Sequence, residues 1–528
     1  MAGLRRALVA IAAALALADA SIVALALPPL LVEFDTTITG VAAVVGVYAL
    51  VLAAAILPAR RIKPGPLGLF VFAAASVGCA IAPSLWVLLV FRALQAAGAA
   101  AALLTAYAVL DAGESRAGRR LWLAAALVGT AAGPAVGGVL TELFDWRAIF
   151  AVQAPIALAA AFATSAPPSR EPARTPADRT DLAGLALTAA AFTAVLFLLV
   201  IELVAGFAIS PLRAALGVTI LPLAALAALL IGGPKRARAL AGAILLAGGA
   251  AALAFLPAPT IAWTVVPQVL AGLGMGLALP ALSRDRDLPD AARNLVARHA
   301  GIVLVLAILA PVATARLEDA TERAILQGAS LVLDAQIDPL KKLELAPGLL
   351  DEVDVDRPRE ALSEAVDARR AEFAADADVY DRLGDRLDDV VVAAIQDAFR
   401  IAYLIAAALA LIAAALFASA WRRPAVWLAA AAAAGCAVVF VVEADDEAPP
   451  EVVLQDPCQE RALPQGDGIT GALQQQALRM LDDAACKAGS TREELALALF
   501  NSTRAREYEQ EYGVDPRSTI PLLSLLDG

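Results

Sequence analysis

Long apolar runs, separated by short charged or proline-containing stretches, fill most of the first 315 residues and return near residue 396. The hydrocarbon core of a bilayer is about 30 Å thick, so a helix that rises about 1.5 Å per residue needs roughly 20 apolar residues to cross it. Runs of this length predict transmembrane helices. Thirteen segments qualify: 7–31, 38–58, 66–82, 84–110, 120–141, 147–165, 182–203, 211–231, 239–257, 260–282, 299–315, 396–420 and 424–442.

Two long segments outside these runs are polar and acidic. Residues 315–395 hold 20 acidic and 10 basic side chains, and residues 443–528 hold 17 and 7. Their apolar residues recur at helical spacing, so both segments are predicted to be helical. In the tail, Gly471–Ala488 and Thr491–Glu511 are predicted to be amphipathic helices, and Thr491 with Glu494 indicates a capping box.

The composition agrees with a polytopic membrane protein. A hydrophobic fraction of 60%, a charged fraction of 18% and a mean hydropathy of +0.73 lie outside the range of soluble domains. A net charge of -11 argues against nucleic-acid binding, which needs basic surface. One histidine and four cysteines leave too few ligands for an ordinary zinc or iron–sulfur site. We therefore expect no enzyme, metal or cofactor.

Basic residues alternate between the short loops, and Lys and Arg mark cytoplasmic loops. If the N-terminus is cytoplasmic, every second loop is basic, as at Arg60-Arg61-Ile62-Lys63 and Arg422-Arg423. The opposite loops are poor in bases until the two acidic segments, which then both fall outside. This pattern predicts a cytoplasmic N-terminus and an extracytoplasmic C-terminus.

Cysteine placement agrees with that topology. Cys79 and Cys436 fall in spans, whereas Cys458 and Cys486 both lie in the outward-facing tail. An oxidising exterior permits a disulfide between them, which would stabilise a small module by roughly 3 kcal/mol. The alternative is a solvated acidic tail with two free thiols.

The sharpest local motif lies inside the fifth span, where Gly129, Gly133, Pro134, Gly137 and Gly138 occur together. Glycines spaced by four let two helices approach closely, and a proline removes a backbone hydrogen bond and allows a bend. Such a helix is suited to an interface that moves.

This string resembles the antiporter motif of the major facilitator superfamily, in its fourteen-span drug:proton antiporter branch. Other stretches resemble motifs of that branch in the same order: Leu17 to Pro28 with Asp19; Phe91 to Gly98 with Arg92 and Gln95; and Trp146 to Pro155 with Trp146, Arg147, Phe150 and Pro155. The resemblance implies two six-helix halves that rock around a midplane cavity, and export of small molecules, including drugs, in exchange for protons.

The chain departs from the family pattern in two ways. One pair of spans is missing, which leaves twelve core spans and an extra thirteenth. After the second span, alignment puts Leu57 where the family has an acid that helps to lock the cytoplasmic gate.

Ionisable side chains inside spans are the functional candidates, because burying an unpaired charge in hydrocarbon is costly. Asp19 is predicted to exchange protons or contact substrate, with a structural hydrogen-bonded acid as the alternative. The resemblance implies that Arg92 takes part in proton transfer, together with Gln95; a structural ion pair is the alternative.

Glu202 is expected to reach water at the membrane interface, with a functional role as the alternative, and His299 is expected at the interface, with a proton relay as the alternative. Tryptophans such as Trp122 are expected to be interface anchors rather than a stacking cage.

The expected domains are an N-terminal six-helix half (1–165), a cytoplasmic linker (166–181), a C-terminal half (182–420) with an extracytoplasmic helical insertion (315–395), an extra span (421–443) and an extracytoplasmic tail (444–528). The insertion and the tail are expected either to form one cap or to be independent solvated segments. An unknown extracytoplasmic partner is possible.

These features predict an all-α membrane protein of the major facilitator fold. We expect a proton-coupled exporter of a small hydrophobic or amphipathic compound in a bacterial plasma membrane, with lipid, substrate and protons as its partners. The alternative is a degenerate transporter fold that anchors or senses through its outer module.

Overall fold

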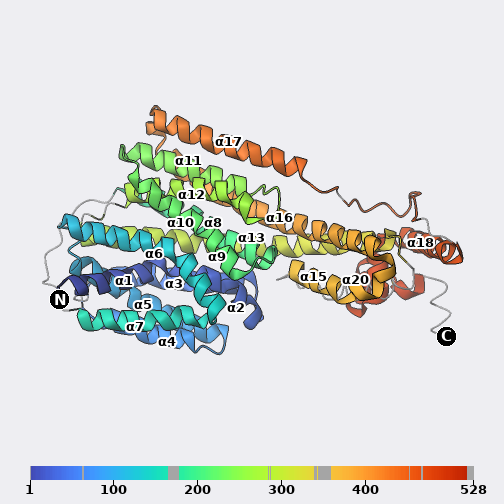
Figure 1. Cartoon of the computed structure of the whole chain (residues 1–528), viewed down its shortest axis with the longest axis horizontal. Helices are drawn as coiled ribbons and strands as arrows, with labels where there is room; N and C mark the ends of the chain where they lie inside the picture. The colour runs from blue at the N-terminus through green and yellow to red at the C-terminus, as the bar shows by residue number, and fades with distance from the viewer. Residues whose placement is uncertain are drawn as a thin grey trace. The chain divides into compact units, whose positions relative to one another are not determined.

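The computed structural model consists of helices within the part of the chain that it describes (Figure 1). That part covers residues 2–61, 65–164, 178–283, 285, 287–337, 342, 358–450, 452–464 and 468–519. Alanine and leucine dominate the apolar runs, and both favour helix. A helix also satisfies its backbone N–H and C=O groups internally, as a bilayer requires. The predicted all-α class is confirmed.

The chain divides into two compact units. Unit 1 comprises Met1–Ala205, Ile209–Ala315 and Phe399–Glu447; unit 2 comprises Gly206–Ala208, Arg316–Ala398 and Ala448–Gly528. The predicted apolar spans lie almost entirely in unit 1. The polar insertion and most of the polar tail share unit 2, so these two segments are not independent of each other.

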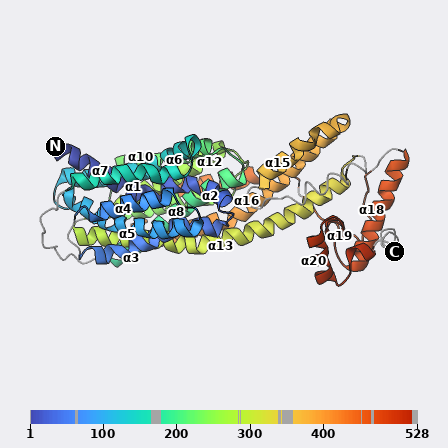
Figure 2. The same cartoon turned by 90° about the horizontal axis from the view of Figure 1, so that it is seen from below.

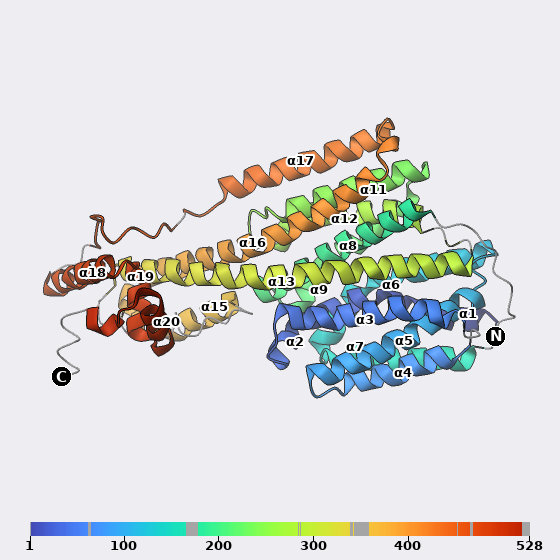
Figure 3. The same ribbon diagram turned by 180° about the vertical axis from the view of Figure 1, so that it is seen from behind.

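The first part of unit 1, residues 2–163, is called here the N-terminal half. Within it α1 packs against α6 and α7, α5 packs against α3 and α4, and α4 packs against α7 (Figure 3). Hydroxyl groups of Thr37, Ser84 and Ser115 cap three of the helices. The helices are α1 (Ala2–Val23), η1 (Ala24–Ala26), α2 (Leu27–Glu33), α3 (Ile38–Ala59), α4 (Leu67–Ala80), α5 (Leu85–Val109), α6 (Arg116–Leu143) and α7 (Arg147–Ala163).

The rest of unit 1 is called the C-terminal half here, and unlike the predicted C-terminal half (182–420) it includes the predicted extra span (421–443). In it α12 packs against α8, α10 and α11, and α11 packs against α17. Its elements are α8 (Arg179–Ile201), the π-helix η2 (Glu202–Gly206), α9 (Pro211–Val218), α10 (Ile220–Ala227), η3 (Ala228–Leu230), α11 (Lys235–Leu253), α12 (Ile261–Leu282), η5 (Ala418–Ala420) and α17 (Pro424–Asp446). Two long helices, α13 (Leu288–Asp334) and α16 (Ala377–Ala415), contribute residues to both units.

The predicted spans all coincide with helical segments, but two of them have different ends. The segments 299–315 and 396–420 overlap the 47-residue α13 and the 39-residue α16. A change from apolar to polar side chains does not interrupt backbone hydrogen bonds, so each helix continues into the acidic insertion.

The number of spans stays a prediction. Among the described residues, nine helices are long and apolar enough to cross a membrane, or up to eleven if each of two bent helix pairs counts as one span. The predicted span at 66–82 contains α4, which has 14 residues. Most of the predicted linker 166–181 lies outside the described residues.

The described residues of unit 2 form two small apolar cores. One holds Val332, Ile337, Phe373, Tyr380, Leu383 and Leu387, and the other holds Ala484, Ala485, Leu495, Ala498 and Tyr508. Ion pairs join the insertion to the tail: Arg492 lies 3.0 Å from Asp334, and Arg504 donates to Glu322 at 2.8 Å. The remaining elements are α15 (Pro358–Arg369), η4 (Arg370–Asp376), α18 (Gly468–Ala488), α19 (Arg492–Phe500), α20 (Ser502–Tyr512) and η6 (Pro516–Thr519), with α18 to α20 adjacent in Figure 2.

The tail corrects one prediction and confirms another. The single helix expected at 491–511 is wrong, because the chain breaks at Asn501, whose side-chain oxygen accepts from the Thr503 N–H at 2.7 Å and caps α20. The capping box is confirmed: Thr491 Oγ1 accepts from the Glu494 N–H at 3.2 Å, and Glu494 Oε2 accepts from the Thr491 N–H at 2.7 Å.

Candidate functional site

Asp19 and Arg92 form an ion pair inside the N-terminal half. Arg92 Nη1 donates to Asp19 Oδ1 at 2.7 Å, and Nη2 donates to the other carboxylate oxygen. Arg92 is 0% exposed and Asp19 is 1% exposed. A buried charge is strongly unfavourable without a partner, so each residue permits the burial of the other. Two candidates from different spans therefore belong to one site.

Gln95 extends this pair into a hydrogen-bonded chain. Its Oε1 accepts from Arg92 Nη1 at 2.7 Å, and its Nε2 donates to Ser76 Oγ at 2.8 Å and to Gln153 Oε1 at 3.0 Å. All of these side chains are buried. Helices α1, α4, α5 and α7 thus meet through polar side chains in an otherwise apolar bundle.

Arg92 keeps other partners besides Asp19. Its Nε donates to the Val44 carbonyl at 3.1 Å, and its guanidinium carbon lies 4.4 Å from the ring centroid of Tyr48 and 5.5 Å from that of Phe150. The hydrogen bonds of Asp19 within the described residues, in contrast, all go to Arg92. The arginine is fixed by its surroundings, whereas the acid is held by the arginine.

Asp19 lies where α1 changes direction. The helical segments Gly3–Asp19 and Ser21–Glu33 meet at an angle of 59°. Ser21 Oγ donates to the Ala18 carbonyl at 2.7 Å, and the 3₁₀ turn η1 follows. A hydroxyl that bonds back to the preceding turn favours such bends.

The glycine motif brings α6 against the same part of α1. A Cβ at Gly129 would lie 2.6 Å from the Ala14 carbonyl oxygen, and one at Gly137 would collide with the carbonyl oxygen of Ile22. A Cβ at Gly133 would collide with the side-chain hydroxyl of Ser21, and one at Gly138 would collide with the Cβ of Ala215 of α9. Together with Pro134 inside α6, the glycines make a close helix contact that larger residues would exclude.

The motif residues of the stretch Trp146 to Pro155 lie in two different surroundings. Arg147 Nη1 donates to Glu33 Oε2 and to Asp145 Oδ2, both at 3.1 Å, and Trp146 Nε1 also donates to Glu33. This cluster fastens the start of α7 to the end of α2. Further along α7, Phe150 contacts Arg92, and Pro155 lies within the helix.

The C-terminal half buries an acid of its own. Glu202, at the start of η2, is 1% exposed and accepts from Tyr403 Oη of α16 at 2.7 Å. The expectation that Glu202 reaches water is therefore wrong. His299 is likewise buried, with Nδ1 2.8 Å from the Leu295 carbonyl of its own helix.

Among the described residues, Leu17 and Arg298 both line two small cavities that lie between the halves. The space that the centres of water molecules can occupy is about 50 Å³ in one and about 30 Å³ in the other. This suffices for a few water molecules. The first cavity is lined by Leu17, Trp122, Leu123, Ala126, Leu279, Pro280, Ser283, Asp285, Ala291, Asn294, Leu295 and Arg298.

Asp285, between α12 and α13, joins the halves at the end predicted to be cytoplasmic. It accepts from Trp122 Nε1 at 2.7 Å and from Asn294 Nδ2 at 2.8 Å, and its carbonyl accepts from Tyr107 Oη at 3.0 Å. Trp122 is consequently buried, and the idea that it is an interface anchor is wrong.

Several residues of these sites were missed by sequence reasoning. Ser76, Gln153 and Tyr48 lie in apolar runs, where a neutral polar side chain gives little signal. Gln153 was detectable only as part of the stretch Trp146 to Pro155. The role of Asp285 depends on tertiary contacts with residues more than 160 positions away, which no local pattern reveals.

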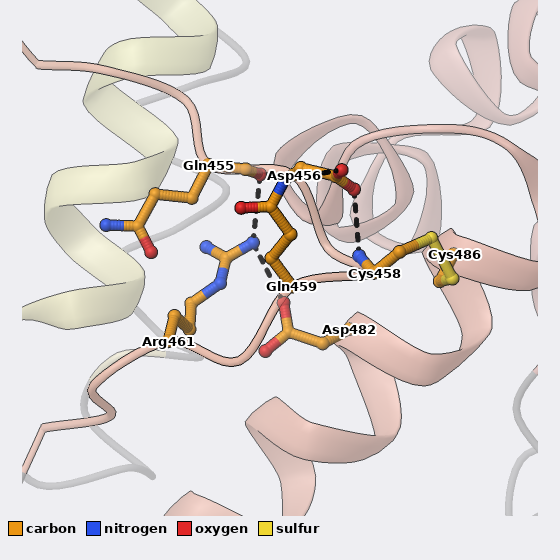
Figure 4. Close-up of a disulfide and its surroundings, with 7 residues drawn as sticks. All are labelled: Gln455, Asp456, Cys458, Gln459, Arg461, Asp482 and Cys486. Carbon is orange, nitrogen blue, oxygen red and sulfur yellow. Dashed lines mark hydrogen bonds and ion pairs between the residues drawn. A yellow bond between two sulfur atoms is a disulfide. The ribbon is translucent and has the colours of Figure 1, made fainter.

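The tail contains the expected cysteine pair. Cys458 and Cys486 are joined in the structure, with their Cα atoms 5.0 Å apart (Figure 4). Beside them Arg461 lies 3.0 Å from Asp482 and donates to the Gln455 carbonyl at 3.1 Å. Burial raises the pKa of the Asp482 carboxyl, and Arg461 and Arg492 oppose that rise.

The chain is similar to known proteins in both its sequence and its fold. The sequence model of the Major Facilitator Superfamily matches residues 9–284, more than half of the chain. Multidrug resistance protein Stp of Mycobacterium tuberculosis is 34% identical over 158 residues, which cover 28% of this chain and 29% of that protein. Riboflavin transporter RibZ of Clostridioides difficile is 30% identical over 155 residues, which cover 27% and 34%. The matches thus span about a third or less of these relatives.

Among solved structures, a bacterial homologue of the human lysosomal transporter Spinster, in an inward-facing and unoccupied conformation, has a similar fold. The TM-score is 0.53 at 17% identity, and the alignment covers 80% of this chain and 99% of that one. The similarity concerns the fold alone.

Proposed function

The chain belongs to the major facilitator superfamily of transporters, and from this premise we propose that it is a proton-coupled exporter of a small hydrophobic or amphipathic molecule. The proposed setting is a bacterial plasma membrane, with the N-terminus in the cytoplasm and unit 2 outside. In this proposal the two halves rock against each other and expose the cavities between them to each side in turn.

The observation that carries the proposal is the arrangement around Asp19. This acid lies at the bend of α1, and its hydrogen bonds within the described residues go to an arginine that has other partners. A proton bound to Asp19 would remove its charge and weaken the ion pair, while Gln95, Val44 and the aromatic rings continue to hold Arg92. Release of Asp19 would free α1 to change its bend.

The helix contact between α1 and α6 supports the same mechanism. The glycine face of α6 lies against the segment from Ala14 to Ile22, which contains Asp19. A smooth contact without interlocking side chains allows one helix to shift along the other. Because α6 also packs against α9 and α10 of the C-terminal half, a change at Asp19 would thereby alter how the halves meet.

Asp285 would supply the cytoplasmic closure for which the family uses another acid. The family's position is occupied by Leu57, whereas Asp285 bonds to residues of the N-terminal half. Breaking the bonds to Trp122 and Tyr107 would open the cavities toward the cytoplasm. The loss of the family acid therefore does not require the loss of gating.

The test compares exported small molecules and lipids from cells that express wild type, Asp19→Asn or Asp145→Asn at matched levels. Asp145 is a carboxylate of the same unit that is paired with Arg147 and partly exposed, so the amide substitution there is the control. We expect at least one compound to leave cells with wild type and Asp145→Asn but not with Asp19→Asn.

An equally flat profile for all three proteins, in exported compounds and in drug sensitivity, would contradict proton-driven export. The rival function, a transporter fold that anchors or senses through its outer module, would then be preferred. The specific observation behind the rival is unit 2, in which the insertion and tail form a folded body with two cores.

A further inference from the structure

Arg298 on α13 occupies the boundary between the two halves. It lines both of the cavities there, together with Leu17 of α1. The second cavity receives residues from both halves, and among the described residues that line it Arg298 is the only charged one. Arg298 is thus the point at which the N-terminal half, the C-terminal half and both cavities meet.

The second cavity is amphipathic. Its walls are mostly apolar, with Leu27, Phe192, Phe197, Ile302 and Leu306 among them, and Ser21 and Thr193 add hydroxyl groups. A ligand that filled an enlarged form of this cavity would have a large apolar body. The same ligand would place any polar group beside the guanidinium.

Arg298 is bonded far less completely than Arg92. Its hydrogen bond in the structure runs from Nη2 to the Leu17 carbonyl at 3.4 Å, and it has no ion pair within the described residues. Arg92, in contrast, has an acid, an amide and a carbonyl as acceptors. A guanidinium has five N–H donors, so most of those of Arg298 are available to a ligand or to water.

We propose that Arg298 binds the anionic group of the transported molecule, and that the substrate is therefore an amphipathic anion. A guanidinium matches the two oxygens of a carboxylate or a phosphate with paired hydrogen bonds. The apolar walls hold the hydrocarbon part, as in most small-molecule sites. This inference rests on the proposed function, because it names the substrate class of that same transporter.

The position of Arg298 also links substrate to the proton site. The carbonyl that Arg298 contacts belongs to Leu17, two residues before Asp19. A bound anion competes with that carbonyl for the guanidinium and so removes a contact between α13 and α1. Substrate binding and the state of Asp19 therefore act on the same segment of α1.

The experiment measures binding to the purified full-length protein in detergent at neutral pH by calorimetry. Four ligands share a ten-carbon chain and differ in the head: decanoate, decyl phosphate, decanamide and decyltrimethylammonium. The variants are Arg298→Gln, Arg298→Lys and Arg213→Gln. Arg213 is an exposed arginine of the same unit and serves as the matched control.

We expect wild type and Arg213→Gln to bind one or both anions at least tenfold more tightly than decanamide or decyltrimethylammonium. Arg298→Gln removes that preference, and Arg298→Lys keeps part of it. A preference for decanoate assigns a carboxylate substrate, and one for decyl phosphate assigns a phosphate. A thermal unfolding curve for each variant checks that it is folded.

The proposal is overturned if wild type does not prefer the anions, or if a folded Arg298→Gln protein retains the preference. Failure of the proposed function has a different signature. In that case anions bind at Arg298, but the export profile is the same with and without Asp19. Export that depends on Asp19 but not on Arg298 would support the proposed transporter function and contradict the proposal that its substrate is an anion.

Discussion

Each half of unit 1 contains an acid that is only 1% exposed, Asp19 in one and Glu202 in the other, and the two acids are neutralised differently. Asp19 in the N-terminal half is paired with Arg92, whereas Glu202 in the C-terminal half accepts a hydrogen bond from the hydroxyl of Tyr403. The first arrangement contains two full charges and a chain of polar side chains. The second contains one acid and one neutral donor.

This difference indicates which of the two acids couples protonation to movement. A carboxyl group that faces a phenol needs no charge to keep its hydrogen bond, so Glu202 can remain in one protonation state. A carboxylate that faces a guanidinium loses most of its interaction energy when it gains a proton. Coupling of protonation to movement is therefore expected at Asp19 and not at Glu202.

The largest expected effect follows removal of one partner of the ion pair. Arg92→Gln leaves Asp19 buried without a cation, which is expected to lower the free energy of unfolding by about 3–5 kcal/mol. The double variant Asp19→Asn, Arg92→Gln carries no unpaired charge and should recover much of that stability. Denaturant titration of the purified proteins measures both values.

We expect the double variant to recover stability but not export, because it has no acid at position 19 that could take up a proton. A double variant that is as unstable as the single one would show that the pair is not the source of the loss. A double variant that still exports in a proton-dependent manner would assign the coupling to another residue, with Glu202 as the first to test.

The next largest effect is expected where a glycine of a neighbouring helix packs against α1, which carries Asp19, or against α8, which directly precedes Glu202. Gly137→Ala places a Cβ against the Ile22 carbonyl of α1, and Gly301→Ala places one against the Ala186 carbonyl of α8. Both should destabilise the protein by about 1–3 kcal/mol through overpacking. Only Gly137→Ala should also reduce export sharply in cells that stably express the variant, because α1 is expected to move and α8 is not.

Gly46→Ala is the control for both glycine variants. A Cβ at Gly46 of α3 meets no atom within 4 Å, so alanine should be neutral or stabilising by up to about 1 kcal/mol through helix propensity. Equal loss of export in Gly137→Ala and Gly301→Ala would remove the distinction between the two acids.

A smaller effect is expected at Asp285, the acid whose hydrogen bonds join the two halves. Trp122→Phe removes one hydrogen bond to its carboxylate and should weaken the contact between the halves by about 1–3 kcal/mol. A cysteine introduced at Ala126, which lines the adjoining cavity, should then react several-fold faster with a thiol reagent. The same cysteine without Trp122→Phe is the control, and unchanged reactivity would exclude Asp285 as a closure.

The smallest effect is expected at Glu202. Glu202→Gln retains a carbonyl that accepts from Tyr403, so stability should change by less than about 1 kcal/mol and export should persist. Tyr403→Phe, which removes the donor, should cost more than Glu202→Gln. Loss of export in the amide variant would show that both acids carry protons.

Much of the fold could be predicted from the sequence. The thirteen apolar runs correspond to helices. The residues of each run favour a helix, and a helix satisfies the backbone hydrogen bonds of the run without partners from elsewhere. The candidates Asp19, Arg92 and Gln95 were detectable for a similar reason: a charged or amide side chain is conspicuous in an apolar run. The roles proposed for them remain to be tested.

Other features could not be read in this way. The sequence pattern does not predict the break at Asn501, because asparagine also occurs within amphipathic helices. Ser76, Tyr48 and Tyr403 are ordinary residues of apolar helices, and they gain their importance from the charged groups that face them. Trp122 looked like a membrane anchor because its partner, Asp285, is distant in the sequence.

The sequence by itself determined the elements of this protein: where apolar helices form, which segments are polar, and which spans contain charge. These properties depend on side chains within one or two helical turns. Only the tertiary structure decided which charges are neutralised. Arg92 and Arg298 both lie in helices of unit 1, yet packing surrounds the first with acceptors and places the second beside cavities. That choice depends on distances between helices, which the sequence of a single helix does not specify.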